Sequence, residues 1–279
     1  MRSGAHTSPT AWRRRIRVVD DGGSELRISV AERSGAGTPI VYLHGFGSTG
    51  KDFDGAAAVP EWSGRTLLAP DLPGFGASAA PASAERWSVE RMADLVVRLI
   101  EVEAAAPATL IGHSMGGLVG LLVCQRAPRS VRAFVNVEGN LAPVDCRVLS
   151  RAVAERSERE PRQETLAWLA ETMAASGAPG YDRFARDLDS RVDPVVAGPV
   201  CRAIVRLSDR APLLRWFVDL RVPRALLHGS LNGDLDYLPD LAASGVPVFT
   251  VEGADHFPAF SHPEAFYRTL VDILQTLET

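Results

Sequence analysis

Short apolar runs recur along the chain, and turn-forming or charged residues bound most of them. A short apolar run flanked in this way predicts a β-strand. The predicted strands lie near residues 16–19, 25–31, 39–43, 65–69, 108–112, 132–138, 224–228 and 246–251. Helix-like patterns separate most of these runs. The sequence therefore predicts strands that alternate with helices over most of its length.

Two of the predicted helices have a clear apolar face. The first begins after Ser88, a good N-cap residue, and its apolar residues then follow at helical spacing. These residues are Met92, Leu95, Val96 and Leu99. A closing helix begins near Pro263, since proline is favoured in the first helical turn. Its apolar face consists of Phe266, Leu270, Ile273, Leu274 and Leu277.

Composition limits the possible partners and location. The chain has 279 residues, of which 46% are hydrophobic, and this is enough to bury one large core. The net charge is −4 and no basic stripe stands out, so we expect no nucleic-acid partner. No run approaches the roughly eighteen apolar residues of a membrane span. No apolar signal core follows Arg13-Arg14-Arg15, so we also expect no membrane association.

The three cysteines carry a further expectation. Cys124, Cys146 and Cys201 are odd in number and widely spaced along the chain. This pattern predicts reduced thiols, a cytoplasmic protein, and neither a disulfide framework nor a bound metal.

The first candidate catalytic motif is Gly112-His113-Ser114-Met115-Gly116, a G-x-S-x-G pattern that directly follows the apolar run 108–111. The small and apolar residues 117–124 follow it and predict a helix. A sharp turn from strand to helix would hold the central serine in a strained backbone conformation, for which the two glycines leave room. Ser114 is therefore the candidate nucleophile.

A serine nucleophile needs a base, and His256 has the most suitable position. It lies in the loop between the last predicted strand and the last predicted helix, 142 residues after Ser114. This placement fits the chain order serine, acid, histidine. His262, in the same segment, is expected to be a surface or capping residue at the start of the helix.

The loop after the strand at residues 39–43 has the sequence His44-Gly45-Phe46-Gly47. A glycine-loosened turn can present a backbone N–H toward Ser114. We expect the N–H groups of Phe46 and Met115 to form an oxyanion hole. His44 is expected to be a structural hydrogen-bonding residue, and Asp71, ahead of a Pro-Gly turn, to bind local backbone groups.

Four motifs, in this order along the chain, resemble those of the α/β-hydrolase superfamily. They are His44-Gly45-Phe46-Gly47, Asp71-Leu72-Pro73-Gly74-Phe75-Gly76, Gly112-His113-Ser114-Met115-Gly116 and Gly253-Ala254-Asp255-His256-Phe257. The resemblance covers residues 17–277. It implies an α/β fold with a mostly parallel eight-stranded sheet, helices on both faces, and a lid inserted after the sixth strand. The fold alone does not set the function, because this superfamily includes many enzyme classes and some receptors.

The segment 141–222 breaks the alternation of strands and helices and is interpreted as a helical lid over Ser114. One helical face carries Leu166, Leu169 and Met173. The flanking core comprises residues 1–140 and 223–279. Candidates to line the pocket under the lid are Trp168, Phe184, Trp216 and Phe217. The lid arginines, among them Arg151, Arg156, Arg159 and Arg162, are expected to lie on solvated helix faces.

The acid of the triad departs from the pattern of the superfamily. The usual carboxylate lies three residues past the glycine that ends the seventh strand, and here that residue is Asn232. An amide supplies no negative charge to stabilise an imidazolium. Glu138, at the end of the sixth strand, and Asp234, two residues past Asn232, are the alternatives. We favour Glu138, because a charge at the end of an apolar strand needs a partner.

These features together predict a serine hydrolase that cleaves an ester, thioester or lactone of a small acyl substrate through an acyl-enzyme. No cofactor is expected. Acyl transfer or macrocyclisation, with an alcohol or amine in place of water, is the alternative within this chemistry. A ligand-binding protein or a non-hydrolytic cyclase is the alternative outside it. The sequence leaves the substrate and the oligomeric state open.

Overall fold

The computed structural model describes residues 12–20, 25–104 and 106–278, and eight strands form one sheet. These strands are β1 (Arg13–Asp20), β2 (Glu25–Arg33), β3 (Gly37–Leu43), β4 (Arg65–Pro70), β5 (Ala108–His113), β6 (Val131–Val137), β7 (Arg224–Gly229) and β8 (Val248–Val251). Each predicted strand is present, although β8 begins at Val248 and not at residue 246. Residues 1–11, on which the expectation about a signal segment partly depends, lie outside the described residues.

The strand order is β1-β2-β4-β3-β5-β6-β7-β8. β1 pairs antiparallel with β2, and β2 with β4. The pairings from β4 across to β8 are all parallel, which confirms the mostly parallel eight-stranded sheet. The carboxyl ends of β3, β5, β6, β7 and β8 therefore meet at one edge of the sheet, where the loops that follow them converge.

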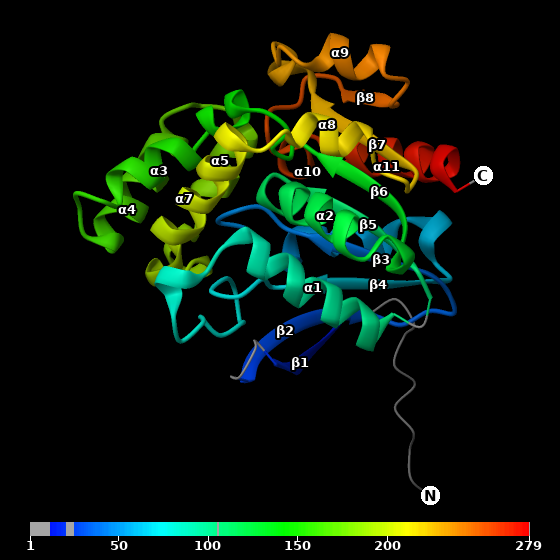
Figure 1. Cartoon of the computed structure of the whole chain (residues 1–279), viewed down its shortest axis with the longest axis horizontal. Coiled ribbons are helices and arrows are strands. Elements are labelled where there is room, and N and C mark those ends of the chain that lie inside the picture. Colours follow the sequence, from blue (N-terminus) through cyan, green and yellow to red (C-terminus); the bar gives the residue numbers. More distant parts are fainter. Residues whose placement is uncertain (1–11, 21–24, 105, 279) are drawn as a thin grey trace, which may run out of the picture.

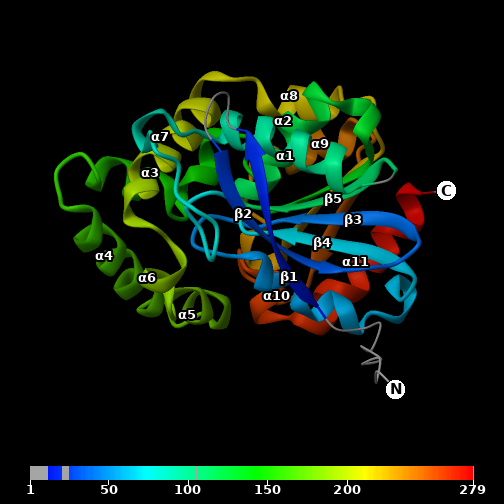
Figure 2. The same cartoon turned by 90° about the horizontal axis from the view of Figure 1, so that it is seen from below.

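Helices cover both faces of the sheet (Figure 2). On one face lie α1 (Val89–Glu103), α2 (Met115–Arg126) and α8 (Leu213–Val218), whereas α11 (Pro263–Leu277) lies on the other. Successive strand residues point to opposite faces and so supply two hydrophobic clusters. In β3, Val41 belongs to the cluster under α1 and α2, and Tyr42 to the cluster under α11. Both helices with a predicted apolar face are confirmed.

The chain between β6 and β7 is helical, and all of its helices except α8 lie to one side of the sheet (Figures 1 and 2). Besides α8 it contains η5 (Pro143–Arg147), α3 (Ser150–Arg156), α4 (Arg162–Ala174), α5 (Pro179–Ala185), α6 (Leu188–Arg191) and α7 (Pro194–Arg210). An isolated β-bridge between Phe75 and Val192 joins this segment to the core. The sequence predicted helices and no sheet strand for this stretch, and its structure agrees.

Short elements fill the remaining connections. They are η1 (Gly50–Ala58), η2 (Pro60–Trp62), η3 (Ala84–Arg86), η4 (Pro128–Ser130), η6 (Ser230–Asn232), α9 (Leu238–Ala243) and α10 (Pro258–Ser261). His262 occupies the N-cap position of α11, as predicted, but its side chain makes no capping hydrogen bond. Within the described ranges, no helix is both long and apolar enough to cross a membrane.

Candidate active site

Ser114 lies at the junction of β5 and α2 in a backbone conformation that L-residues rarely adopt. Its φ is 50° and its ψ is −119°, which lies outside the common allowed regions and indicates local strain. The turn is tight because the two flanking glycines touch other backbone atoms. A Cβ on Gly112 would lie 2.3 Å from the carbonyl oxygen of Gly116, and a Cβ on Gly116 would lie 2.0 Å from that of Leu43. Glycine is therefore required at both positions.

His256 lies in the loop between β8 and α10, with its imidazole beside Ser114. The distance between His256 Nε2 and Ser114 Oγ is 3.2 Å, within hydrogen-bond range. A residue at the end of β5 holds the backbone of this loop, since His113 Nε2–H donates to the carbonyl oxygen of His256 over 2.8 Å. Burial lowers the pKa of His113 to about 3, so this second histidine stays neutral and acts as a donor.

The neighbouring Asp255 is buried and ties the His256 loop to the helical segment above it. Its carboxylate accepts the backbone N–H of Gly180, at the start of α5, over 2.9 Å, and that of Phe257, also over 2.9 Å. A Cβ on Gly180 would lie 2.2 Å from the same carboxylate. The loop and α5 therefore pack together with no room for a side chain at position 180.

Glu138 follows β6 directly and faces the far side of the His256 ring. Its Oε2 lies 3.4 Å from His256 Nδ1, an ion-pair distance. The geometry falls short of a hydrogen bond, and Nδ1 has no other partner. Gly229 N–H donates to Oε1 over 2.7 Å, and Asn232 Nδ2–H donates to Oε2 over 2.5 Å. Glu138 is buried and, like Ser114, has a positive φ, here 53°.

Asp234, the alternative acid, points elsewhere. Its side chain is 69% exposed and pairs with Arg147, whose Nη1 donates to Oδ2 over 2.9 Å. Hydrogen bonding to Arg147 lowers the pKa of Asp234. The structure thus brings Ser114, His256 and Glu138 together and leaves Asp234 at the surface.

The loop after β3 lies against Ser114, where the oxyanion hole was predicted. A Cβ on Gly45 would lie 3.1 Å from Ser114 Cβ. The N–H groups of Phe46 and Met115 donate no hydrogen bond to another described part of the chain. They are thus available to an oxygen bound at Ser114.

The two polar residues predicted to be structural make local hydrogen bonds. His44 Nε2 accepts the N–H of Leu72 over 2.8 Å, and its Nδ1–H donates to the carbonyl oxygen of Gly45 over 2.7 Å. Burial lowers the pKa of His44, which keeps the ring neutral. Asp71 accepts the N–H groups of Gly50 and Ala77, over 2.8 and 3.0 Å.

Phe184 in α5 lies against the loop after β3. Its ring would meet a Cβ on Gly47 at 2.5 Å, and it stacks on Phe257 with the ring centroids 4.8 Å apart. The other pocket candidates lie elsewhere. Phe217 packs on Phe134 of the sheet, Arg156 covers the ring of Trp168, and Trp216 packs beside the core. None of these contacts places the three side chains beside Ser114, so their part in lining a pocket stays a prediction.

The predicted solvated arginines form surface ion pairs. Arg151 pairs with Asp209, Arg156 with Glu160, and Arg162 with Glu85. Arg159 is exposed. None of the four is needed to explain the geometry around Ser114.

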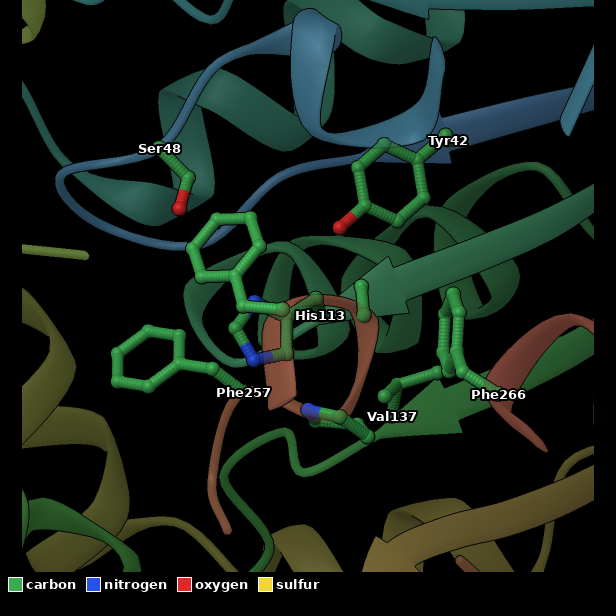
Figure 3. A pocket seen from close by; sticks show the side chains of 9 residues that line it. Tyr42, Ser48, His113, Val137, Phe257 and Phe266 are labelled. Atoms are coloured by element: carbon green, nitrogen blue, oxygen red, sulfur yellow. The ribbon is translucent and has the colours of Figure 1, made fainter. Parts of the chain in front are cut away.

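A small cavity of about 10 Å³ lies behind His113 and is lined by Tyr42, Ser48 and Phe257, among others (Figure 3). This volume suits about one water molecule and is too small for an acyl group. The three cysteines are free and buried. Among the described residues, no cluster of three His, Cys, Asp or Glu side chains has a metal-binding arrangement.

Comparison with protein families shows to which family the chain belongs. The model of the alpha/beta hydrolase family matches residues 40–269. The chain belongs to the alpha/beta hydrolase family. It is 28% identical over 251 residues to a pimeloyl-[acyl-carrier protein] methyl ester esterase of Sodalis glossinidius. The aligned region covers 85% of this chain and 93% of that protein. A match of 39% identity over 100 residues, 35% of this chain, covers only 26% of the dihydrolipoyllysine-residue acetyltransferase component of the acetoin cleaving system of Pseudomonas putida.

Solved structures of other alpha/beta hydrolases share the fold. An esterase of Thermogutta terrifontis has a TM-score of 0.76 at 20% identity, covering 96% of this chain and 100% of that one. The N-acyl homoserine lactonase AidH has a TM-score of 0.71, also at 20% identity, covering 95% of this chain and 98% of that one. At this identity the similarity shows the fold alone.

The sequence did not indicate several residues that shape the site of this alpha/beta hydrolase. Neither the contact of His113 with the His256 backbone nor the contact of Asp255 with α5 was expected. Asn232 was noted as the residue in place of an acid, but its hydrogen bond to Glu138 was not foreseen. Each contact depends on how separate loops meet in space, and no local pattern in the sequence encodes that.

The tight turn at Ser114 generates a stability prediction for Gly116→Ala. The new Cβ would lie 2.0 Å from Leu43 O and 2.7 Å from His44 O, so β3 or α2 must shift. We expect the free energy of unfolding, measured in urea, to fall by about 3 kcal/mol or more. Gly64→Ala is the control, because no atom lies within 4 Å of its added Cβ. Equal stability of the two variants would contradict the close packing of α2 on β3.

Proposed function

We propose that this protein is a serine hydrolase that cleaves an ester, thioester or lactone. The observation that carries the proposal is the line of side chains from Ser114 through His256 to Glu138, with 3.2 Å between Ser114 Oγ and His256 Nε2 and 3.4 Å between His256 Nδ1 and Glu138 Oε2. The imidazole thus has a hydroxyl at one nitrogen and a buried carboxylate at the other. This is the arrangement that turns a serine into a nucleophile.

In the first half of the reaction, Ser114 Oγ attacks the carbonyl carbon while His256 Nε2 takes the hydroxyl proton. The imidazolium forms beside Glu138, whose negative charge stabilises it. His256 then returns the proton to the leaving alcohol or thiol as its bond to the carbonyl carbon breaks. In the second half, water loses a proton to His256 and attacks the acyl-enzyme, which releases the acid and restores Ser114.

The N–H groups of Phe46 and Met115 are proposed to hold the oxyanion of each tetrahedral intermediate. Support comes from their position beside Ser114 and from the absence of another hydrogen-bond acceptor for either group among the described residues. One such donor contributes about 10²–10³ in rate in other hydrolases.

Residues 141–222 are proposed to act as a lid domain on a core of residues 1–140 and 223–279. The support is the all-helical structure of the segment between β6 and β7 and the contact of Phe184 with Gly47. The ester bond of the proposed reaction is supported by the 28% identity to a methyl ester esterase, and the substrate is proposed to be a small acyl compound. A cytoplasmic location is proposed on its three free and buried cysteines.

The nucleophile is tested by Ser114→Ala with short aryl esters as substrates. We expect turnover to vanish and the melting temperature to stay nearly unchanged, because the Ser114 hydroxyl has no described partner besides His256. A fluorophosphonate probe should label the wild-type protein and not the variant. His256→Ala should lose about as much activity, whereas His262→Ala is the matched control and should stay within a few-fold of wild type. Retained turnover in a folded Ser114→Ala protein would contradict the assignment of Ser114 as the nucleophile.

The acid is tested by the pair Glu138→Gln and Asp234→Asn. Both substitutions replace a carboxylate by an amide of the same shape, but only Glu138 faces His256. We expect Glu138→Gln to lower kcat by about 10³–10⁴, as amide replacement of a triad acid does elsewhere. Asp234→Asn should change kcat only a few-fold. If Asp234→Asn is instead the crippling change, the acid belongs to the loop after β7.

A further inference from the structure

Asn232 and His256 share one oxygen of the Glu138 carboxylate. Glu138 Oε2 accepts Asn232 Nδ2–H over 2.5 Å and lies 3.4 Å from His256 Nδ1. The other oxygen, Oε1, accepts the backbone N–H of Gly229 over 2.7 Å. The carboxylate is thus held at both oxygens by residues of the loop after β7, although it belongs to β6.

The amide of Asn232 has only one orientation that fits its surroundings. Its Oδ1 accepts Nη2–H of Arg147 over 2.9 Å, and the same guanidinium binds both carboxylate oxygens of Asp234. Arginine only donates and a carboxylate only accepts, so a flipped amide would face a cation with its NH₂ and an anion with its oxygen. Arg147 therefore directs the Asn232 N–H toward Glu138.

We infer that Asn232 is a positioning residue of the proposed triad: its amide N–H holds Glu138 Oε2 in place beside His256, and Arg147 orients the amide. This inference rests on the proposed function. Asn232, which stands where the superfamily usually has its acid, thus positions Glu138, the proposed acid after β6.

The charges around Glu138 explain why a neutral donor suits this position. The acid beside Glu138 is Asp145 in η5, whereas Tyr237 before α9 and Tyr181 in α5 are neutral, because burial raises the pKa of both phenols. Burial, with a smaller contribution from Glu138, raises the pKa of Asp145 to about 6. Asp145 is thus mostly ionised at neutral pH and already adds negative charge. A further carboxylate at position 232 would repel Glu138, whereas the amide binds it.

The first experiment measures kcat and KM for Asn232→Leu, which keeps the side-chain size and removes the donor. We expect kcat for an aryl ester to fall by about 10–100-fold, the effect of losing one hydrogen bond to a charged group, with KM nearly unchanged. Asp234→Asn is the control, because it leaves the hydrogen bond between Asn232 and Glu138 in place. In a Glu138→Gln background, Asn232→Leu should cost little more. An equal loss in both backgrounds would assign Asn232 a purely structural role and overturn the inference.

The second experiment needs no turnover. Asn232→Asp keeps the shape of the side chain and adds a negative charge beside Glu138, which favours the protonated imidazole. We expect NMR titration of the His256 ring protons to move to higher pH than in wild type, and the acid limb of the kcat/KM profile to move with it. An unchanged titration would overturn the inference whatever the activity. Absence of Ser114-dependent turnover in the wild type would instead refute the proposed function, so the two failures are distinguishable.

Discussion

The arrangement of the candidate site depends on one close approach, that of the turn at Ser114 to the end of β3. A Cβ on Gly116 would lie within 2.0 Å of the Leu43 carbonyl oxygen, so α2 starts in direct backbone contact with β3. This contact sets the N-terminus of α2 beside the loop that carries Phe46. It also holds Ser114 at a φ of 50°, a strain that the surrounding packing must offset. A larger residue at Gly116 would push α2 away from the end of β3, and so move Ser114 away from the proposed oxyanion donor Phe46.

Backbone hydrogen bonds of the sheet also set the position of Glu138, the proposed acid, relative to Ser114. The ladder between β5, β6 and β7 continues past the strand ends, with Ser114 N–H donating to Val137 O over 2.9 Å and Glu138 N–H donating to Leu227 O over 3.0 Å. Ser114 and Glu138 are therefore fixed relative to each other by backbone hydrogen bonds of neighbouring parallel strands. Only His256 comes from a loop that this ladder does not hold, and His113 and Asp255 fix that loop instead.

Much of this could be predicted from the sequence, because the relevant signals are local. The periodicity of apolar residues located all eight strands and both amphipathic helices, and the glycines around Ser114 indicated the strained turn. The choice between Glu138 and Asp234 could not be settled in that way. It depends on which partner each carboxylate reaches: Asp234 binds Arg147 of η5, whereas Glu138 binds Asn232 of η6. Likewise the aromatic side chains of the helical segment all looked alike in sequence. Only the packing of α5 and α8 separates Phe184, near Gly47, from Phe217, which faces the sheet.

The buried carboxylate of Asp255 binds one N–H of α5 and the N–H of the residue after His256. It therefore connects α5 to the loop that carries His256. Moving α5 away from the core breaks a hydrogen bond to a buried charge and loosens the segment that holds the imidazole. The packing of α5 and the position of the His256 loop are therefore thermodynamically linked. Linkage is reciprocal, so any bound group that steadies the imidazole must also hold α5 down, to the same extent in free energy.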